Sequence, residues 1–419
     1  MKILMIDKYY FVKGGAERYM FELSKVLEAN GHEVIPFSMK HPLNFPTSYS
    51  EYFVENIEYN GISKLSKVTT AIKATARMIY YVEARKRLER LIEEHEPDIA
   101  HLHMIDHQLS PSILHSLKKF RIPVIQTVHQ YKLVCPNYKL YNPRTGEICE
   151  KCLSGNLWHP VVERCHKDSV TASFMIALES SLHRMAQIYE NNVDIFHVPS
   201  HFMGKKYLEA GIAPSKIRHM FYSIELQKFA PSFVSGDYLL YFGRLSKEKG
   251  IHTLLNAAKF YPHAPLYIVG DGPQEAELKE YVRQNNLTQV KFWGVKSGAE
   301  LETLVKNSRA VIVPSEWFDN SPLVIYESFA YGRPVIGAQM GGITELIDDG
   351  ETGYLFEAGN VEQLVEQMRR LWEKPQRAIE FGKNARAKAE REFNPTVHYN
   401  RIYDWYCELT SHQPVLAAN

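Results

Sequence analysis

The sequence predicts an α/β protein in which two doubly wound parallel sheets face each other across a cleft. Its 419 residues exceed one domain of ~100–200 residues, so two domains are expected. Short, almost continuous apolar runs alternate with longer amphipathic stretches, as in parallel strands that are buried on both faces and connected by helices. The composition changes at residues 229–236, between one series of such units and the next. That stretch is the predicted linker.

The apolar runs give the predicted strands, and the stretches between them give the helices. The strands are Lys2–Asp7, His32–Ser38, Asp98–His103, Pro123–His129, Ile195–Ser200, Tyr238–Arg244, Leu266–Gly270, Val290–Trp293, Ala310–Pro314 and Pro334–Gly337. Clear helical patterns cover Glu17–Asn30, closed by Gly31, and Gln274–Gln284. Because open sheets of this kind bind ligands at the carboxyl ends of their strands, functional residues are sought in the loops that follow them.

The strand series place the domain boundaries. We expect an N-terminal domain over residues 1–228, with a cysteine-rich insertion at 131–170, and a C-terminal domain over 236–393. Residues 394–419 contain a further helix, which Asn394 or Thr396 can cap and in which Pro395 takes an early position. We expect this helix to cross back to the N-terminal domain; packing on its own domain is the alternative.

Composition excludes several classes of protein. The 49 Lys and Arg residues against 48 Asp and Glu give a net charge of +1, which argues against a nucleic-acid binder. No apolar run approaches the ~18–20 residues that cross a bilayer. Asp7 interrupts the first apolar run too early for a secretory signal peptide. We therefore expect a cytoplasmic protein with reduced thiols.

Two loops after predicted strands are suited to phosphate groups. Gly14 and Gly15 lie between the first strand and its helix, where the backbone can approach an anion at a helix N-terminus. The segment is neither a G-x-G-x-x-G fingerprint nor a Walker A loop, and a plain turn is an equal alternative. Arg244 and Lys249 follow the strand Tyr238–Arg244 and could clamp a diphosphate. A solvated basic turn is the alternative there.

Carboxylates and a histidine lie at two other strand ends. After the strand that ends at Pro314, a polar loop carries Asp319, and Glu327 follows in a helix whose start is predicted at Ser321 (the cap) and Pro322. Carboxylates suit sugar or ribose hydroxyls because each oxygen accepts hydrogen bonds strongly. An exposed helix acid is the alternative for Glu327. His129 ends its strand at the ligand-binding edge, where a structural role is the more common alternative.

Taken in order, these segments resemble the retaining glycosyltransferases of family four, the glycosyl transferases group 1, which have the GT-B fold of two Rossmann-like domains. The matching segments are Gly14–Arg18, Thr127–His129, Gly243–Leu245, Glu248–Gly250, Val269–Pro273, Phe292–Gly294, Asp319 to Glu327, and Gly341–Glu345. The resemblance covers most of both halves and thins over residues 40–95 and 131–170.

The resemblance implies roles in binding a nucleotide-sugar such as a UDP- or GDP-sugar. Gly15, next to Gly14, would approach the distal phosphate, and Arg244 and Lys249 would neutralise the diphosphate. Glu327 would hold the ribose, and His129 would contact the transferred sugar. The loop at Val295 would border the base. The remaining donor-binding positions are Asn320, Ser321 and Leu323.

Two positions depart from the family pattern. Asp319 replaces the first Glu of its E-x7-E motif, so its contact with the donor sugar must be longer, water-bridged or re-aimed. Pro322 has no amide hydrogen to donate. The expected catalytic residues are His129, Asp319, Arg244 and Lys249.

We expect retaining transfer without a catalytic metal, because no Asp-x-Asp pair stands at a strand end. The acceptor would be a saccharide or a lipid-linked saccharide in polysaccharide or lipopolysaccharide assembly. A GT-B epimerase or phosphorylase is one alternative. A non-catalytic nucleotide-sugar-binding protein is another, and Asp319 and Pro322 favour it.

Residues Ser63–Val82 carry Lys and Arg without an acid, and their apolar residues recur at helical spacing. Such a basic amphipathic helix can lie on an anionic membrane surface, so we expect weak peripheral association with the inner face of the membrane. A helix that covers the domain core is an equal alternative.

Four of the five cysteines lie in the insertion, at Cys135, Cys149, Cys152 and Cys165. A Cys-x-x-Cys pair flanked by two single cysteines favours a structural zinc site, with His166 as an alternative fourth ligand. Free or disulfide-paired thiols are the alternative. Because the insertion follows His129, we expect it to shape the acceptor side of the cleft.

Overall fold

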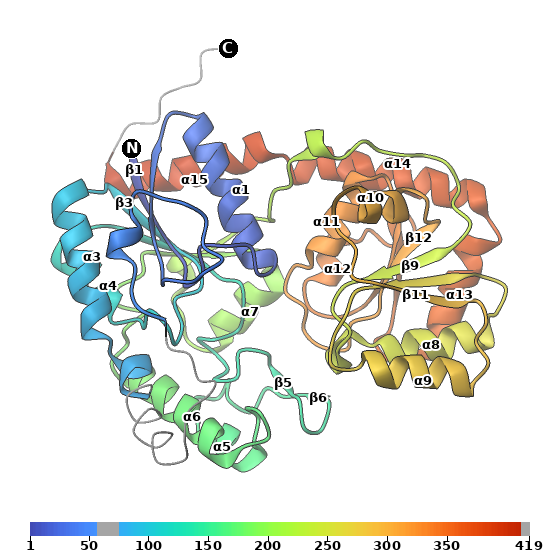
Figure 1. The fold of residues 1–419 in the computed structure, drawn as a ribbon, viewed down its shortest axis with the longest axis horizontal. Helices are drawn as coiled ribbons and strands as arrows, with labels where there is room; N and C mark the ends of the chain where they lie inside the picture. Colours follow the sequence, from blue (N-terminus) through green and yellow to red (C-terminus); the bar gives the residue numbers. More distant parts are fainter. Residues whose placement is uncertain (57–74, 412–419) are drawn as a thin grey trace.

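The computed structural model describes residues 1–56 and 75–411, which fold into two α/β halves (Figure 1). The first half contains a sheet in the order β2-β1-β3-β4-β7-β8, and the second a sheet in the order β11-β10-β9-β12-β13-β14. Every pairing within both sheets is parallel. The strands of the first sheet are β1 (Lys2–Ile6), β2 (Glu33–Phe37), β3 (Ile99–Leu102), β4 (Val124–Thr127), β7 (Ile195–Val198) and β8 (Ile217–His219). Those of the second are β9 (Leu239–Phe242), β10 (Leu266–Val269), β11 (Val290–Gly294), β12 (Ala310–Val313), β13 (Val335–Ala338) and β14 (Gly353–Phe356).

Helices cover both faces of each sheet, as buried parallel strands require. In the first half they are α1 (Gly15–Ala29), α3 (Val82–His95), α4 (Ile113–Lys119), α5 (His159–Glu163), α6 (Val170–Met185) and α7 (His201–Glu209). In the second half they are α8 (Ile251–Phe260), α9 (Glu275–Gln284), α10 (Gly298–Lys306), α11 (Leu323–Ala330), α12 (Ile343–Leu346), α13 (Val361–Trp372) and α14 (Pro375–Glu392). The central strands β3, β4, β7, β9, β12 and β13 are buried along their whole length.

The predicted fold of two parallel α/β sheets is confirmed, and each predicted strand overlaps an observed one. One edge strand of each sheet, β8 in the first and β14 in the second, was not predicted. β8 is only half-buried, and it includes the polar residues Arg218 and His219, so it lacks the apolar run on which the prediction depends.

The last helix, α15 (Pro395–Thr410), lies against α1 of the N-terminal half (Figure 1). Asn394 caps it by accepting a hydrogen bond from the Thr396 amide at 2.8 Å. From α15 the Tyr406 hydroxyl reaches Nδ1 of His101 in β3 at 2.6 Å. The chain therefore begins and ends its described part on the same half, and α15 ties the two halves together.

The insertion after β4 forms a β5–β6 hairpin (Tyr141–Asn142 and Glu147–Ile148), followed by α5 and α6. The hairpin extends toward the C-terminal half (Figure 1). There the Lys139 ammonium pairs with Glu248 at 2.9 Å. A methyl group placed on Gly146 would lie 2.4 Å from Nζ of Lys247, so the two halves are in close contact at this point.

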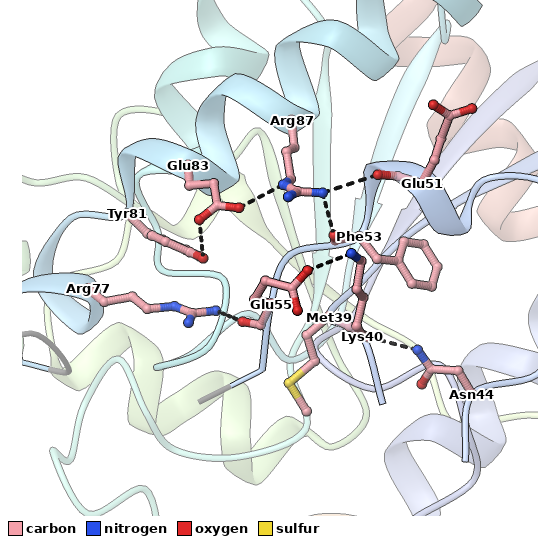
Figure 2. Close-up of polar contacts among 10 residues, drawn as sticks. All are labelled: Met39, Lys40, Asn44, Glu51, Phe53, Glu55, Arg77, Tyr81, Glu83 and Arg87. Atoms are coloured by element: carbon pink, nitrogen blue, oxygen red, sulfur yellow. Dashed lines mark hydrogen bonds and ion pairs between the residues drawn. The ribbon is translucent and has the colours of Figure 1, made fainter. Parts of the chain in front are cut away.

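The predicted basic segment Ser63–Val82 lies largely outside the described residues; its end, residues 75–82, is described. Figure 2 shows Arg77 donating to the backbone oxygen of Glu55, while Lys40 pairs with the Glu55 carboxylate. In the same view Arg87 of α3 donates to the backbone oxygens of Glu51 and Phe53. Arg77 is therefore a buried residue that fixes the chain near Glu55, not part of a solvated basic face.

Within residues 1–56 and 75–411, none of the helices combines the length and the apolar character needed to cross a bilayer.

Candidate active site

A cavity of about 580 Å³ lies between the two halves, at the carboxyl ends of both sheets. The N-terminal half lines it with the start of α1, with the chain after β4, and with Tyr222. The C-terminal half lines it with the loops after β9 and β12. The predicted site residues on its wall are Gly15, His129, Arg244, Lys249, Asp319, Asn320, Ser321 and Leu323. Residues from opposite ends of the sequence thus meet in one place.

The basic loop after β9 presents two cations to this cavity. Gly250 ends the loop with φ +67, and a side chain there would meet the Pro314 oxygen at 1.9 Å, so only glycine fits. Arg244 is exposed, borders the cavity, and has no ion-pair partner within the described part of the chain. The Lys249 ammonium pairs with the Asp319 carboxylate and lies 5.3 Å from the centre of the Trp317 ring. Arg244 is thus the cation that is open to an incoming anion.

Asp319 is directed toward its own domain. Its Oδ2 accepts hydrogen bonds from the Lys249 ammonium and, at 3.1 Å, from the Ser315 hydroxyl. The Asp319 side chain is 10% exposed. The Asp319 carboxylate is therefore held by Lys249 and Ser315, and its expected contact with a donor sugar stays a prediction.

The next two side chains make structural contacts. Asn320 accepts a hydrogen bond from the Ser200 hydroxyl at 3.0 Å, which links the two halves. The prediction that Ser321 caps the following helix is wrong: α11 has no side-chain cap, and its N-cap residue is Pro322. The Ser321 hydroxyl instead bonds the Tyr326 hydroxyl at 2.6 Å, because that group lies one turn further along the helix.

His129 stands at the cavity wall in a chain of hydrogen bonds. Its Nδ1 lies 2.7 Å from the Tyr222 hydroxyl, and its Nε2 lies 3.0 Å from Nδ1 of His103. Nε2 of His103 faces the sulfur of Met5 at 3.0 Å. Because the thioether sulfur can only accept, His103 carries its proton on Nε2 and its Nδ1 is an acceptor. His129 therefore donates from its Nε2 to His103. Nδ1 of His129 is then an acceptor, and the Tyr222 hydroxyl donates to it.

The imidazole of His129 stays neutral at physiological pH. Burial lowers its pKa to about 3, and His197 nearby adds to the shift. Tyr222 also stacks on the ring, with centroids 5.6 Å apart. Both ring nitrogens are engaged, so His129 offers a fixed, neutral ring to the cavity and is poorly suited to act as a base.

Gly15 begins α1, and a side chain at this position would meet Leu323 of α11 at 3.2 Å. The N-termini of α1 and α11 therefore converge on the cavity, where their free amides favour an anion. Gly14 precedes α1, and its amide donates to the Glu17 carboxylate at 2.8 Å.

Glu327 does not line the cavity but lies between the two helices. Arg18 of α1 pairs with Oε1 of Glu327 across the interface. Burial raises the pKa of Glu327 above its usual value, and the charge of Arg18 opposes that rise. Arg18 belongs to the sequence segment that resembles the family, but its pairing with Glu327, 309 residues away, had no sequence signal.

A second cavity of about 790 Å³ adjoins the first along Phe242, Gly243 and Arg244. It lies wholly within the C-terminal half, and Val295 is on its wall. The loops after β10 and β11 form its other walls, so the predicted base-binding residue and the predicted diphosphate-binding residues border one continuous depression.

The insertion adds two residues that the prediction missed. Tyr138 and Lys139 line the cavity opposite Trp317. Lys139 pairs with Glu248, which directly precedes Lys249. Burial raises the pKa of Glu248, but the hydrogen bond and the charge of Lys139 hold it below its usual value. Only the folded insertion brings these residues together, because nothing in the spacing of Lys139 and Glu248 indicates a contact.

The four cysteines of the insertion are present as thiols. Burial raises the pKa of Cys165 to about 12, with a contribution from the nearby Cys149 and Cys135. The described residues contain one group of His, Cys, Asp or Glu side chains whose ligand atoms all lie within 4.8 Å of one another. Three other residues form this group, and these cysteines do not belong to it. A tetrahedral zinc site requires sulfurs about 3.8 Å apart. The zinc site therefore stays a prediction.

Two facing Rossmann-like domains with a cavity between them are the arrangement of the GT-B fold. Comparison with family models agrees. The model described as "Glycosyltransferase Family 4" matches residues 13–227, and that described as "Glycosyl transferases group 1" matches residues 224–388. The chain belongs to glycosyltransferase family 4.

Solved structures share the fold over almost the whole chain. Sucrose-phosphate synthase from Thermosynechococcus elongatus superposes with a TM-score of 0.70 at 20% identity, covering 98% of this chain and 100% of that one. Anabaena Alr3699/HepE in complex with UDP-glucose gives a TM-score of 0.65 at 18% identity, with 97% and 100% coverage.

The sequence relatives match smaller parts of the chain than these solved structures do. An uncharacterised 42.6 kDa protein from the cps region of Klebsiella pneumoniae is 25% identical over 83% of this chain and 87% of its own length. The O-antigen chain mannosyltransferase C of Escherichia coli is 30% identical over 38% of this chain and 43% of its own length. The match to sulfoquinovosyl transferase SQD2 of Arabidopsis thaliana spans 44% of that protein.

Proposed function

We propose that this chain transfers a sugar from a nucleoside-diphosphate sugar to a saccharide or lipid-linked acceptor, with retention of configuration and without a metal ion. Two comparisons support the substrate classes: Anabaena Alr3699/HepE is solved with UDP-glucose, and the Escherichia coli relative is an O-antigen chain mannosyltransferase. Polysaccharide or lipopolysaccharide assembly is the proposed setting.

The donor fits the depression formed by the two joined cavities. The base lies beside Val295, the diphosphate between Arg244 and the amides of α1 and α11, and the sugar toward His129. Arg18 occupies Oε1 of Glu327, so Oε2 is the oxygen that we assign to the ribose hydroxyls. The Lys249 ammonium, held by Asp319, supplies the second cation beside the diphosphate.

In the proposed reaction, the bond between the anomeric carbon and the diphosphate oxygen breaks, and both electrons leave with the diphosphate. Arg244, Lys249 and the helix amides stabilise that developing charge in a preorganised way. The acceptor oxygen bonds to the same face of the sugar, and its proton passes to a phosphate oxygen of the leaving group. His129, neutral and fixed by Tyr222, positions the sugar and transfers no proton in this scheme.

The observation that carries the proposal is the convergence of Arg244, Lys249 and the N-termini of α1 and α11 on one interdomain cavity. A thermal-shift screen of nucleotide-sugars first identifies the donor, since a ligand that binds the folded state raises its melting point. Arg244→Ala and Lys249→Ala should then each lower kcat about 10²–10³-fold. Near-wild-type turnover in either variant would refute the assignment. Donor incubated without acceptor should yield neither an epimer nor a sugar phosphate.

The proposal also includes a structural zinc site in the insertion and association with a membrane surface. A zinc ion held by Cys135, Cys149, Cys152 and Cys165 would stiffen the segment that carries Lys139 into the cavity. Purified protein should then contain zinc that Cys149→Ser with Cys152→Ser removes, while donor binding survives.

If the acceptor is lipid-linked, the protein acts on the cytoplasmic side of a membrane. It should then co-sediment with anionic vesicles at low salt.

A further inference from the structure

Apart from the cavity, the described residues contain one cluster of potential metal ligands, which lies where the two halves meet. His201 begins α7, His219 ends β8, and Glu345 lies in α12 of the C-terminal half. One ligand atom from each lies within 4.8 Å of the other two. A zinc ion at its usual bond lengths holds such atoms about 3.3 Å apart. Side-chain rotations that move the ligand atoms about 1.5 Å or less closer together would therefore bring all three within bonding distance of one ion.

His219 has a buried nitrogen that the protein leaves unsatisfied. Its Nε2 is shielded from solvent and has no hydrogen-bond partner in the described part of the chain. The His201 ring lies against it, with centroids 3.6 Å apart.

Glu345 is already oriented toward this cluster. Its two carboxylate oxygens accept hydrogen bonds from the amides of His201 and Phe202, each at 2.7 Å. Each oxygen keeps a further lone pair, because a carboxylate oxygen can accept more than one bond. The amides act as the outer partners that fix a metal ligand in place. His201 is exposed, which gives an ion access from solvent.

We propose that His201, His219 and Glu345 bind a divalent transition-metal ion such as Zn²⁺, which bridges the two domains outside the transfer site. Two imidazoles and one carboxylate suit zinc, cobalt, nickel or copper, whereas magnesium and calcium prefer all-oxygen sites. The proposal stands apart from the metal-independent transfer above, because none of the three residues lines the cavity.

The ion would favour the closed arrangement of the cleft. The amide of Gly342, three residues before Glu345, donates to the backbone oxygen of Asp319 at 2.8 Å. Glu345 is thus coupled to the loop beside Lys249, while both histidines belong to the other half. Bridging the halves here would restrict the opening through which products leave.

The test uses Co²⁺ as the probe and the full chain with Cys149→Ser and Cys152→Ser as the background, so that the cysteine cluster cannot supply the signal. Absorption titration of this protein should show one bound Co²⁺ with nitrogen and oxygen ligands, and no thiolate charge-transfer band. His219→Gln, which keeps the side chain polar, should weaken Co²⁺ binding at least tenfold. Glu345→Gln should weaken it as well.

The matched control is His252→Gln, which replaces a half-buried histidine of α8 that pairs with Glu277 at 3.0 Å and lies outside the cluster. It should leave Co²⁺ affinity unchanged. Melting points measured in chelator confirm that each variant is folded. No saturable Co²⁺ binding, a thiolate band, or equal affinity in the background and the His219→Gln variant would overturn the proposal. Its failure leaves the transfer proposal intact, since donor binding and turnover are measured in chelator.

Discussion

Tyr222→Phe removes a single oxygen atom next to the proposed sugar position. In the structure that hydroxyl lies 2.7 Å from Nδ1 of His129 and fixes the tautomer in which Nε2 donates to His103. Leaving a buried acceptor without its donor costs about 1–3 kcal/mol. His129 borders the cavity, and water can partly replace the lost donor, so we place the loss at about 1–2 kcal/mol. That corresponds to a ~5- to 30-fold fall in kcat.

Steady-state kinetics with the donor found by the thermal-shift screen provide the measurement. The matched control is Tyr238→Phe, which also removes a buried hydroxyl; Tyr238 donates to the Leu304 oxygen at 2.6 Å, away from the cavity. Both variants should lose stability, but only Tyr222→Phe should lose kcat. The positioning role of Tyr222 is refuted if the two variants turn over at the same rate.

Two further predictions concern stability. Burial lowers the pKa of His129 and His398 to about 3 and of His197 to about 4, all below the unfolded value. Because these groups bind protons only on unfolding, the free energy of unfolding should fall as the pH drops below 6.5, by about 1.4 kcal/mol per histidine at pH 5.5. Denaturant midpoints at pH 7.5 and 5.5 measure this change, and equal midpoints would contradict it. Lys132 pairs at 2.8 Å with Glu179, which is 1% exposed, so Lys132→Met should cost about 3–5 kcal/mol, because the buried carboxylate loses its ammonium partner and is left with His107 at 3.4 Å. Adding Glu179→Leu should recover much of that loss; no recovery would show that the cost of Lys132→Met has another cause.

The sequence predicted the features that depend on local patterns. Buried parallel strands are continuous apolar runs, and Gly250 in the loop after β9 marks a place where a side chain cannot fit, because it would meet the Pro314 oxygen at 1.9 Å. The loops that follow those strands meet because the parallel sheets bring their carboxyl ends to one edge. The fold was therefore predictable, and most of the predicted catalytic and donor-binding residues lie on the cavity wall.

Contacts between distant residues were not predictable. The Ser321 hydroxyl hydrogen-bonds the Tyr326 hydroxyl instead of the helix amides, and local capping rules do not take such an alternative partner into account. Lys139 reaches Glu248 only because the hairpin extends across the cleft. Tyr222 follows the short strand β8, whose polar residues conceal it. Such pairings depend on how the two halves dock, and that docking has no periodic signature in a single sequence.

The docking itself can be tested at Arg18, which pairs with Glu327 across the interface and with Glu22 one turn along α1 at 3.1 Å. The Glu327 side chain is 12% exposed, whereas that of Arg18 is 35% exposed, so solvent screens the interdomain pair in part. We expect a coupling energy of about 1–2 kcal/mol between Arg18 and Glu327. The helical pair with Glu22 should give only about 0.3–0.5 kcal/mol.

A double-mutant cycle in nucleoside-diphosphate affinity separates the two pairs. Calorimetric Kd values are measured for Arg18→Ala, Glu327→Gln and their combination, and then for the same cycle with Glu22→Gln as the matched control. Arg18→Ala should also move the loss of affinity on acidification to higher pH. Without Arg18 the burial of Glu327 raises its pKa unopposed, and a protonated carboxyl is a weaker acceptor for ribose hydroxyls. If the Glu327 cycle yields no more coupling than the Glu22 cycle, Arg18 does not organise the ribose site, and Glu327 binds donor without help from the N-terminal half.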